Sequence, residues 1–186
     1  QSVVDEIYQQ ELQYRVGPTY KSGEPLGIYS YEINYPQVGR YWSANNIRYK
    51  IVKKTDTERE VVAMNLSYAK DSDKNKVKKV VIPNTVALAG KTYRVVGVNK
   101  NAFKGLKNLT TVTIGKNVRN IGAKAFYGCK KLKTVKIQTK KCTFSGKSIW
   151  KKTSKKLVVK VPKSALKKMR KQLKKSGLKA KAVKAA

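Results

Sequence analysis

Apolar residues recur at a fixed interval through the centre of the chain. The segment VNKNAFKGLKNL at 98–109 is matched 23 residues later by IGAKAFYGCKKL at 121–132, and Val112 is matched in the same way by Val135. Self-similarity with a period of about 20–29 residues is typical of stacked repeats, each made of one short strand and a return segment. The pattern predicts such a stack in the middle of the chain.

The repeat register also predicts the core. A period in this range indicates a leucine-rich-repeat solenoid. Phe103 and Phe126 occupy the same position in consecutive repeats and are expected to stack, while small residues at Ala102 and Ala125 let the return segments pack closely. The residues expected to point inward are Leu109, Val112, Ile114, Val118, Ile121, Ala125, Phe126, Cys129, Leu132, Val135 and Ile137.

Apolar patterning predicts more strands before these repeats. Two strands are expected at 48–52 and 60–64 around a polar turn, followed by a strand at 79–82 and a hairpin over 86–96. If the strand at 79–82 is aligned with the strand that ends at Ile114, this segment is the same repeat with the hairpin inserted.

The third repeat is degenerate but keeps apolar residues at the matched positions. Phe144 takes the position of Ile121, Ile149 and Trp150 take that of the phenylalanine, and 157–161 supplies the strand. The stack is therefore expected to continue to residue 161.

A basic amphipathic helix is expected to follow over 164–176, with Ser164 as its N-cap. Helices of this kind also bind membranes. The apolar stripe here is narrow and suits the open end of the stack, so a capping helix is favoured, followed by a basic tail that one last short strand would close. The stripe consists of Leu166, Met169 and Leu173.

The N-terminal segment has a different character. Residues 1–16 read as a helix and 17–46 are rich in tyrosine. The expected domains are 1–46, either a cap over the first repeat or the remnant of an upstream domain, and 47–186, the repeat domain. The cap is favoured because an exposed repeat end needs covering. The fold class is α+β: a short solenoid of β-strands with irregular or short helical return segments, capped by an N-terminal β or mixed segment and a C-terminal basic helix.

Charge is distributed unevenly. All ten acidic residues lie within residues 1–73, whereas the rest of the chain holds 34 of the 43 basic residues and no acid. Such a field attracts polyanions: nucleic acid, anionic wall polymer, glycosaminoglycan or acidic lipid. Lysine supplies nearly all of it, and arginine, the better fork for phosphate and base edges, is limited after residue 73 to Arg94, Arg119 and Arg170. Specific nucleic-acid recognition is therefore not expected.

The residue types argue against catalysis and metal binding. The chain has no histidine, which excludes a Ser-His or Cys-His nucleophile pair. Its two cysteines, Cys129 and Cys142, have neither histidine nor nearby carboxylates to complete a zinc site and are expected to be buried free thiols, with a disulfide as the alternative. No enzyme activity, cofactor or metal is expected. No apolar run reaches 18 residues, and any export signal is expected to have been removed or never present.

Two basic surfaces are the candidate binding sites. Outward strand positions form columns of threonine and lysine without large aromatic anchors, so this face either captures an anionic ligand or only solvates the fold. The candidates on the strand face are Lys79, Thr111, Thr113, Thr134, Lys136 and Lys160. The candidates on the C-terminal helix are Lys167, Lys168, Arg170, Lys171, Lys174 and Lys175.

The segment LTTVTIGKNVRNIGAKAFYGCKKLKTVKI, residues 109–137, resembles the BspA-like leucine-rich repeat, a 23-residue type found on bacterial surface proteins. The resemblance covers roughly residues 47–183, and this part of the chain is similar to domains found in Gram-positive gut bacteria. It implies an extracellular or cell-surface protein of a Gram-positive bacterium, used for adhesion or ligand binding. It carries over no ligand-contacting residue.

Three functions stay open at this point. The leading one is a non-enzymatic surface or secreted repeat protein that binds an extracellular protein or, through charge, an anionic polymer such as a wall polymer or glycosaminoglycan. The alternatives are a structural or stalk module of a larger surface protein and a non-specific nucleic-acid binder. The oligomeric state is not predicted.

Overall fold

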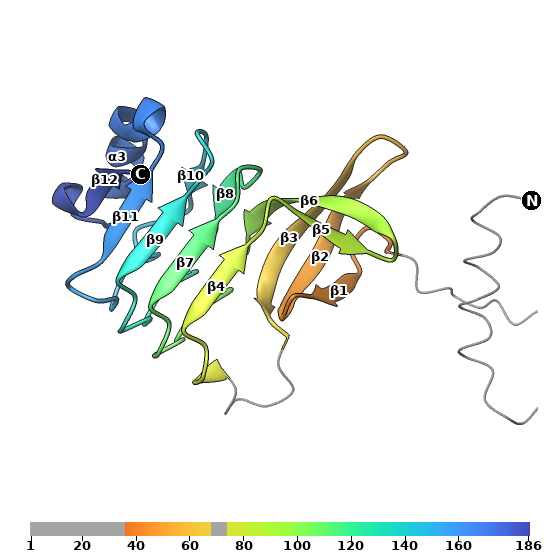
Figure 1. The fold of residues 1–186 in the computed structure, drawn as a ribbon, viewed down its shortest axis with the longest axis horizontal. Coiled ribbons are helices and arrows are strands. Elements are labelled where there is room, and N and C mark those ends of the chain that lie inside the picture. Colours follow the sequence, from red (N-terminus) through yellow and green to blue (C-terminus); the bar gives the residue numbers. More distant parts are fainter. Residues whose placement is uncertain (1–35, 68–73) are drawn as a thin grey trace, which may run out of the picture. The chain divides into compact units, whose positions relative to one another are not determined.

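The structure, a computed structural model, describes residues 36–67 and 74–186 (Figure 1). The predicted helix over 1–16 and most of the tyrosine-rich segment 17–46 lie outside the described residues. The regular structure of the described part consists mostly of strands, with one short α-helix near the C-terminus.

One sheet is formed by the predicted repeat strands. Its strands run parallel in the order β12-β11-β9-β7-β4 (Figure 1). Each is three or four residues long, because a repeat commits only a short segment to this sheet. The strands are β4 (Lys79–Ile82), β7 (Thr111–Ile114), β9 (Thr134–Ile137), β11 (Val158–Val161) and β12 (Val183–Ala185).

The pairing register is the one that the repeat predicts. Val112 lies opposite Val135, as their 23-residue offset requires. Ile82 lies opposite Ile114, which confirms that β4 begins a repeat into which a hairpin is inserted. The last strand pairs β11 in parallel, so the basic tail does close the sheet with one more short strand.

The second sheet was only partly predicted. The expected antiparallel pair of β2 and β3 and the hairpin of β5 and β6 are both present. The return segments, expected to be irregular or helical, contribute two-residue strands that pair in parallel and extend this sheet in the order β3-β6-β8-β10. The members are β1 (Tyr41–Ala44), β2 (Ile47–Lys54), β3 (Arg59–Leu66), β5 (Thr85–Leu88), β6 (Lys91–Val98), β8 (Asn120–Ile121) and β10 (Thr143–Phe144).

One hydrophobic core joins the two sheets. Every residue predicted to point inward from Leu109 to Ile137 is completely buried. Phe103 stacks on Phe126 with ring centroids 5.7 Å apart, and Phe126 stacks on Trp150 at 5.5 Å, so the aromatic position repeats through the degenerate third copy.

The C-terminal helix begins later than expected. A 3-10 turn, η1 (Lys163–Ala165), precedes α3 (Leu166–Lys175), and no side chain caps the start of either, so the predicted Ser164 N-cap is wrong. Ser164 lies inside the 3-10 turn, whose backbone bond from Ala165 N–H to the Pro162 carbonyl (2.9 Å) sets the first turn instead.

The apolar face of α3 packs on the repeats as predicted. Met169 and Leu173 are completely buried. At the end of the helix, the Trp150 indole N–H donates a hydrogen bond of 2.9 Å to the Ser176 hydroxyl, which is itself buried. Among the described helices, none is long and apolar enough to cross a bilayer.

Candidate functional site

The structure gives the strand-face candidates the columns that the sequence predicts. Lys79 lies opposite Thr111, which lies opposite Thr134. In the neighbouring column, Thr113 lies opposite Lys136, which lies opposite Lys160. The three lysines are exposed and the three threonines are partly buried between them.

A further lysine extends the second column. Lys184 of β12 lies opposite Lys160 and is exposed, so Lys136, Lys160 and Lys184 form a row across three neighbouring strands, here called the lysine ladder. Neighbouring strands lie about 4.8 Å apart, and like charges directly opposite each other destabilise a sheet. Every ion pair between described residues involves Glu58 or Glu60, so the ladder has no internal counter-charge.

The helix candidates form a second exposed basic surface. All six lie on the solvent side of α3, opposite the buried Met169 and Leu173. Arg170 differs from the lysines because its Nη2 donates a hydrogen bond of 3.2 Å to the Val183 carbonyl. A hollow of about 540 Å³ is lined by both Arg170 and Lys184, so the helix surface meets the end of the lysine ladder there.

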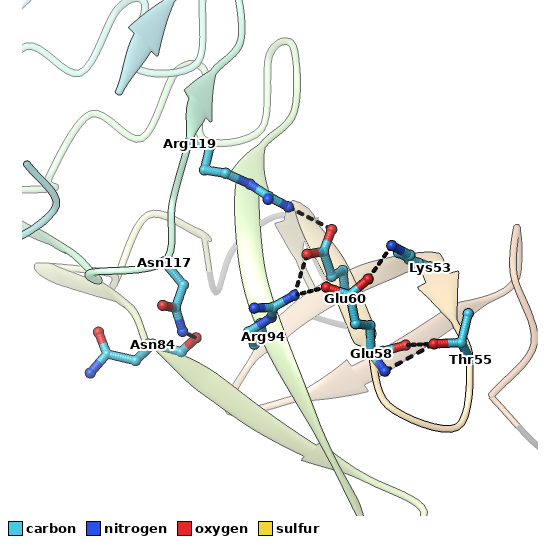
Figure 2. A network of polar contacts seen from close by, with 8 residues as sticks. All are labelled: Lys53, Thr55, Glu58, Glu60, Asn84, Arg94, Asn117 and Arg119. Carbon is cyan, nitrogen blue, oxygen red and sulfur yellow. Dashed lines mark hydrogen bonds and ion pairs between the residues drawn. The ribbon is translucent and has the colours of Figure 1, made fainter. Parts of the chain in front are cut away.

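The ion pairs between described residues all belong to one cluster, which lies on the other sheet and was not predicted. Glu60 of β3 is 7% exposed and accepts hydrogen bonds from two arginines (Figure 2). Arg94 Nη2 lies 2.8 Å from Glu60 Oε1, and Arg119 Nη2 lies 2.6 Å from Oε2. Each carboxylate oxygen thus has its own guanidinium, and two cations share one anion.

The backbone pairing sets this geometry. Glu60 and Arg94 are register partners in the parallel pair of β3 and β6. Arg119 immediately precedes β8; its N–H donates to the Val96 carbonyl (2.8 Å) and its carbonyl accepts from Thr143 N–H (2.9 Å). Both arginine side chains are therefore attached to backbone positions that are held by hydrogen bonds.

Glu58 extends the cluster toward solvent. It accepts a second hydrogen bond of Arg94 Nη2, at 2.9 Å, and forms an ion pair with Lys53 (Figure 2). The hydrogen bond from Lys53 and then that from Arg94 hold the pKa of the Glu58 carboxyl below its usual range. Its backbone N–H donates to the Thr55 hydroxyl at 2.9 Å, which fixes the turn that presents it.

A concave space of about 460 Å³ opens beside this cluster, here called the arginine cavity. It lies beside the inserted hairpin and the two loops that follow β7 and β9. Apart from Glu60, every charged residue that lines it is a cation. The lining residues are Glu60, Arg94, Val96, Lys116, Asn117, Arg119, Gln138, Thr139, Lys140 and Lys141.

The sequence did contain a signal for this cavity. Two of the three arginines after residue 73 line it, and its only carboxylate is one of the last acidic residues before the acid-free part of the chain. The missing information was the pairing of segments 34 and 59 residues apart.

The two cysteines were expected to be buried free thiols. Cys129 and Cys142 are both free and buried, which confirms the prediction. Burial raises the pKa of Cys129 to about 11 and that of Cys142 to about 12, so both stay protonated near neutral pH. Within the part of the chain that the structure describes, no group of three or more carboxylate or thiol residues could hold a metal ion.

Comparison with known proteins identifies the repeat type. The sequence profile described as "BspA type Leucine rich repeat region", in six copies, matches residues 72–179. The match begins after β3, so the first three strands lie outside it. No curated protein matches the chain in sequence.

The solved structures that are similar to this chain include three proteins. They are a leucine-rich cell surface protein of Faecalibacterium prausnitzii (20% identity, TM-score 0.48), a leucine-rich repeat protein of Bacteroides ovatus (19%, 0.42) and the pneumococcal vaccine antigen PcpA (15%, 0.33). The alignments cover 66%, 66% and 70% of this chain and 30%, 38% and 52% of those chains, respectively. The chain therefore spans about a third to a half of their lengths.

Proposed function

The chain belongs to the BspA-type leucine-rich repeat family, and from that premise we propose that it is a non-enzymatic protein of the bacterial surface that holds an anionic polymer against its lysine ladder. The family resemblance supports a location outside the cell or on the surface of a Gram-positive bacterium. The polymer would be an anionic wall polymer or a glycosaminoglycan, which present negative groups at regular intervals.

The observation that carries the proposal is the lysine ladder. Lys136, Lys160 and Lys184 stand opposite one another, all exposed, on three neighbouring strands. This arrangement costs stability in the free protein through like-charge repulsion. Binding of a polyanion removes that cost and releases counterions from the polymer, so the ladder favours an extended anionic partner.

The rest of the strand face supports a shallow, charge-driven contact. Thr113 adds a hydroxyl next to Lys136, and Thr111 and Thr134 line the adjacent column. Hydroxyls can hydrogen-bond sulfate, phosphate or sugar oxygens. A face without large aromatic anchors gives modest affinity that depends strongly on salt.

The test compares two triple variants of equal charge. Lys136→Gln, Lys160→Gln and Lys184→Gln together remove the ladder. Lys107→Gln, Lys131→Gln and Lys156→Gln together remove the same charge from exposed loop positions, one in each repeat. Binding to heparin and to teichoic acid is measured by calorimetry between about 50 and 500 mM salt, the range over which screening becomes strong.

The ladder variant is expected to bind at least about tenfold more weakly at low salt, because three charge-assisted contacts are lost. The loop variant is expected to lose much less. Equal losses in the two variants would mean that binding follows total charge and that the ladder is not a site. If the unaltered protein binds neither polymer at low salt, the structural-module alternative is favoured instead.

A further inference from the structure

We propose that the arginine cavity is a discrete binding site for one tetrahedral oxyanion group, a phosphate or sulfate ester carried on a larger molecule. The site lies apart from the lysine ladder and does not depend on it. Four features of the cavity support this site: two arginines held in place by Glu60, their unused N–H donors, lysines around the rim, and loops fixed by hydrogen bonds.

The two guanidiniums are held in place before any ligand arrives. Glu60 is buried and uses one oxygen for Arg94 and the other for Arg119. Because both oxygens are occupied by arginines, the carboxylate acts as an anchor that orients the two forks. Such preorganisation lowers the entropy that a ligand must lose on binding.

Most donors of the two arginines are still available. A guanidinium carries five N–H donors in one plane, and its bidentate contact suits phosphate and sulfate oxygens. Within the described residues, Arg94 and Arg119 bond protein acceptors only through Nη2. Their side chains are 45% and 60% exposed, so the other nitrogens can reach a ligand.

The rim adds positive charge with no acid to neutralise it. Lys116, Lys140 and Lys141 line the same cavity and are exposed. None of them forms an ion pair among the described residues, and the chain has no acid after residue 73. Five cations therefore face one carboxylate, and a concave site of one sign concentrates the opposite charge.

The loops that present the rim are themselves ordered by hydrogen bonds. Asn117 Nδ2 donates to the Asn84 carbonyl at 2.9 Å, and Lys116 N–H donates to Asn84 Oδ1 at 2.7 Å. In the next repeat the Thr139 hydroxyl donates to the Lys141 carbonyl at 3.0 Å and accepts from Lys141 N–H at 3.3 Å. The rim is thus built on two fixed turns.

A purely structural ion pair explains less of this arrangement. Arg94 is shared between Glu58 and Glu60, but Lys53 also pairs with Glu58, so three cations serve two carboxylates and one positive charge is left over. Neither arginine is buried by the contact. Elsewhere after residue 73 almost all of the positive charge comes from lysine, which keeps a protein soluble as well as arginine does. Two of the three arginines after residue 73 are at this cavity, where a planar fork differs from a point charge.

The test uses the whole chain of 186 residues and two-dimensional NMR titration with inorganic phosphate, sulfate and acetate at equal ionic strength. Phosphate and sulfate are expected to shift the backbone amides of Asn117, Gln138 and Lys141 in a saturable way, and acetate is expected to bind at least about fivefold more weakly because it offers fewer oxygens to the two forks. Titration with glycerol phosphate and with a sulfated monosaccharide then shows which ester the site prefers.

The variant Arg119→Lys keeps the charge but removes the fork, and it is expected to weaken phosphate binding about tenfold. Arg119 is the more exposed of the two arginines, so the fold should survive, which a thermal melt checks. The control is Arg170→Lys on α3, which lies outside the cavity lining and should bind phosphate normally.

The proposal would be overturned if phosphate shifted the amide signals of lysines on every face and if both arginine variants reduced these shifts equally. That result would indicate only a counterion atmosphere. Equal affinity for acetate and phosphate would overturn the choice of ligand. The ladder variant separates the two proposals: it should bind phosphate in the cavity normally even if it has lost the polymer.

Discussion

Glu60 is the single residue on which the arginine cavity depends. Its carboxylate is the only anion between Arg94 and Arg119, and it is buried while they are partly exposed. Without that charge, two guanidiniums would face each other with no acid between them. A residue that looks structural is therefore also the one that arranges the proposed site.

The variant Glu60→Gln tests this role. It keeps the side-chain shape but removes the charge, so it is expected to lower the free energy of unfolding by about 1–3 kcal/mol, less than for a fully buried ion pair because both arginines are half exposed. Urea denaturation measures the loss. The control Glu58→Gln, on the solvent side of the cluster, should be milder, and an equally large effect there would contradict the assigned anchor role.

The two thiols give a second prediction for single residues. Burial holds the pKa of Cys129 at about 11 and of Cys142 at about 12, against an ordinary value of 9.0. Because the folded state keeps these protons longer than the unfolded chain does, their contribution to stability is complete below about pH 9 and is lost as the pH rises above it.

Thiol labelling checks the prediction directly. At pH 8 iodoacetamide should modify neither thiol in the folded protein and both after unfolding in guanidinium chloride. The variant that carries Cys129→Ala and Cys142→Ala should lose stability less steeply above pH 9 than the unaltered protein. Fast labelling of the folded protein would show that the thiols are more accessible than their burial indicates.

Among the elements, the inserted hairpin decides where the cavity forms. Strands β5 and β6 extend the first repeat, and β6 carries both Arg94 and Val96 to the cavity wall. The two strands are joined by Ala89 and Gly90, both with positive φ, of 44° and 68° respectively. Alanine in this conformation is strained, whereas asparagine followed by glycine suits such a turn.

The variant Ala89→Asn is therefore expected to raise the free energy of unfolding by about 0.3–1 kcal/mol. Thermal and urea denaturation measure the gain. The control Ala87→Asn, exposed in the middle of β5, should instead lower stability because asparagine is unfavourable in strands. A loss of stability in Ala89→Asn would mean that the turn does not hold this conformation.

The elements also show what the sequence could and could not predict. The first sheet was predictable because each repeat places two aliphatic residues in its short strand at a constant offset, which sets both the strands and their pairing. The parallel strands β8 and β10 were missed because two residues are too few to show alternation. Lys184 lies 24 residues after Lys160, the spacing that also separates Lys160 from Lys136, but its strand follows the helix α3 and a 3-10 turn, η2 (Ala180–Ala182), and is only three residues long.

The cavity was less predictable than the strand face for a physical reason. Outward columns follow from strand register alone, so Lys136 and Lys160 could be placed next to each other in advance. The cavity instead combines side chains from β3, β6, the segment before β8 and two loops, which meet only when the second sheet forms. Charge composition indicated an anionic partner but gave no location for it.

For the whole molecule, the unbalanced charge predicts a stability that rises with salt. Residues 74–186 contain 34 basic residues and no acid, and Arg94 and Arg119 of this segment form ion pairs with Glu58 and Glu60. Repulsion between the other charges acts against the folded state. At a separation of about 5 Å in water, each pair of facing charges costs at most about 0.8 kcal/mol, and the lysine ladder contains two such pairs.

The melting temperature is expected to rise by several degrees, about 3–6 °C, between about 20 and 300 mM sodium chloride as the charges are screened. The ladder variant should melt higher than the loop variant at low salt and gain less from added salt, because the two differ only in where three charges were removed. Calorimetry at a series of salt concentrations measures both effects. If the melting temperatures of the two variants respond to salt identically, repulsion is spread evenly over the surface. The ladder lysines would then have no extra repulsion energy that an anionic partner could relieve.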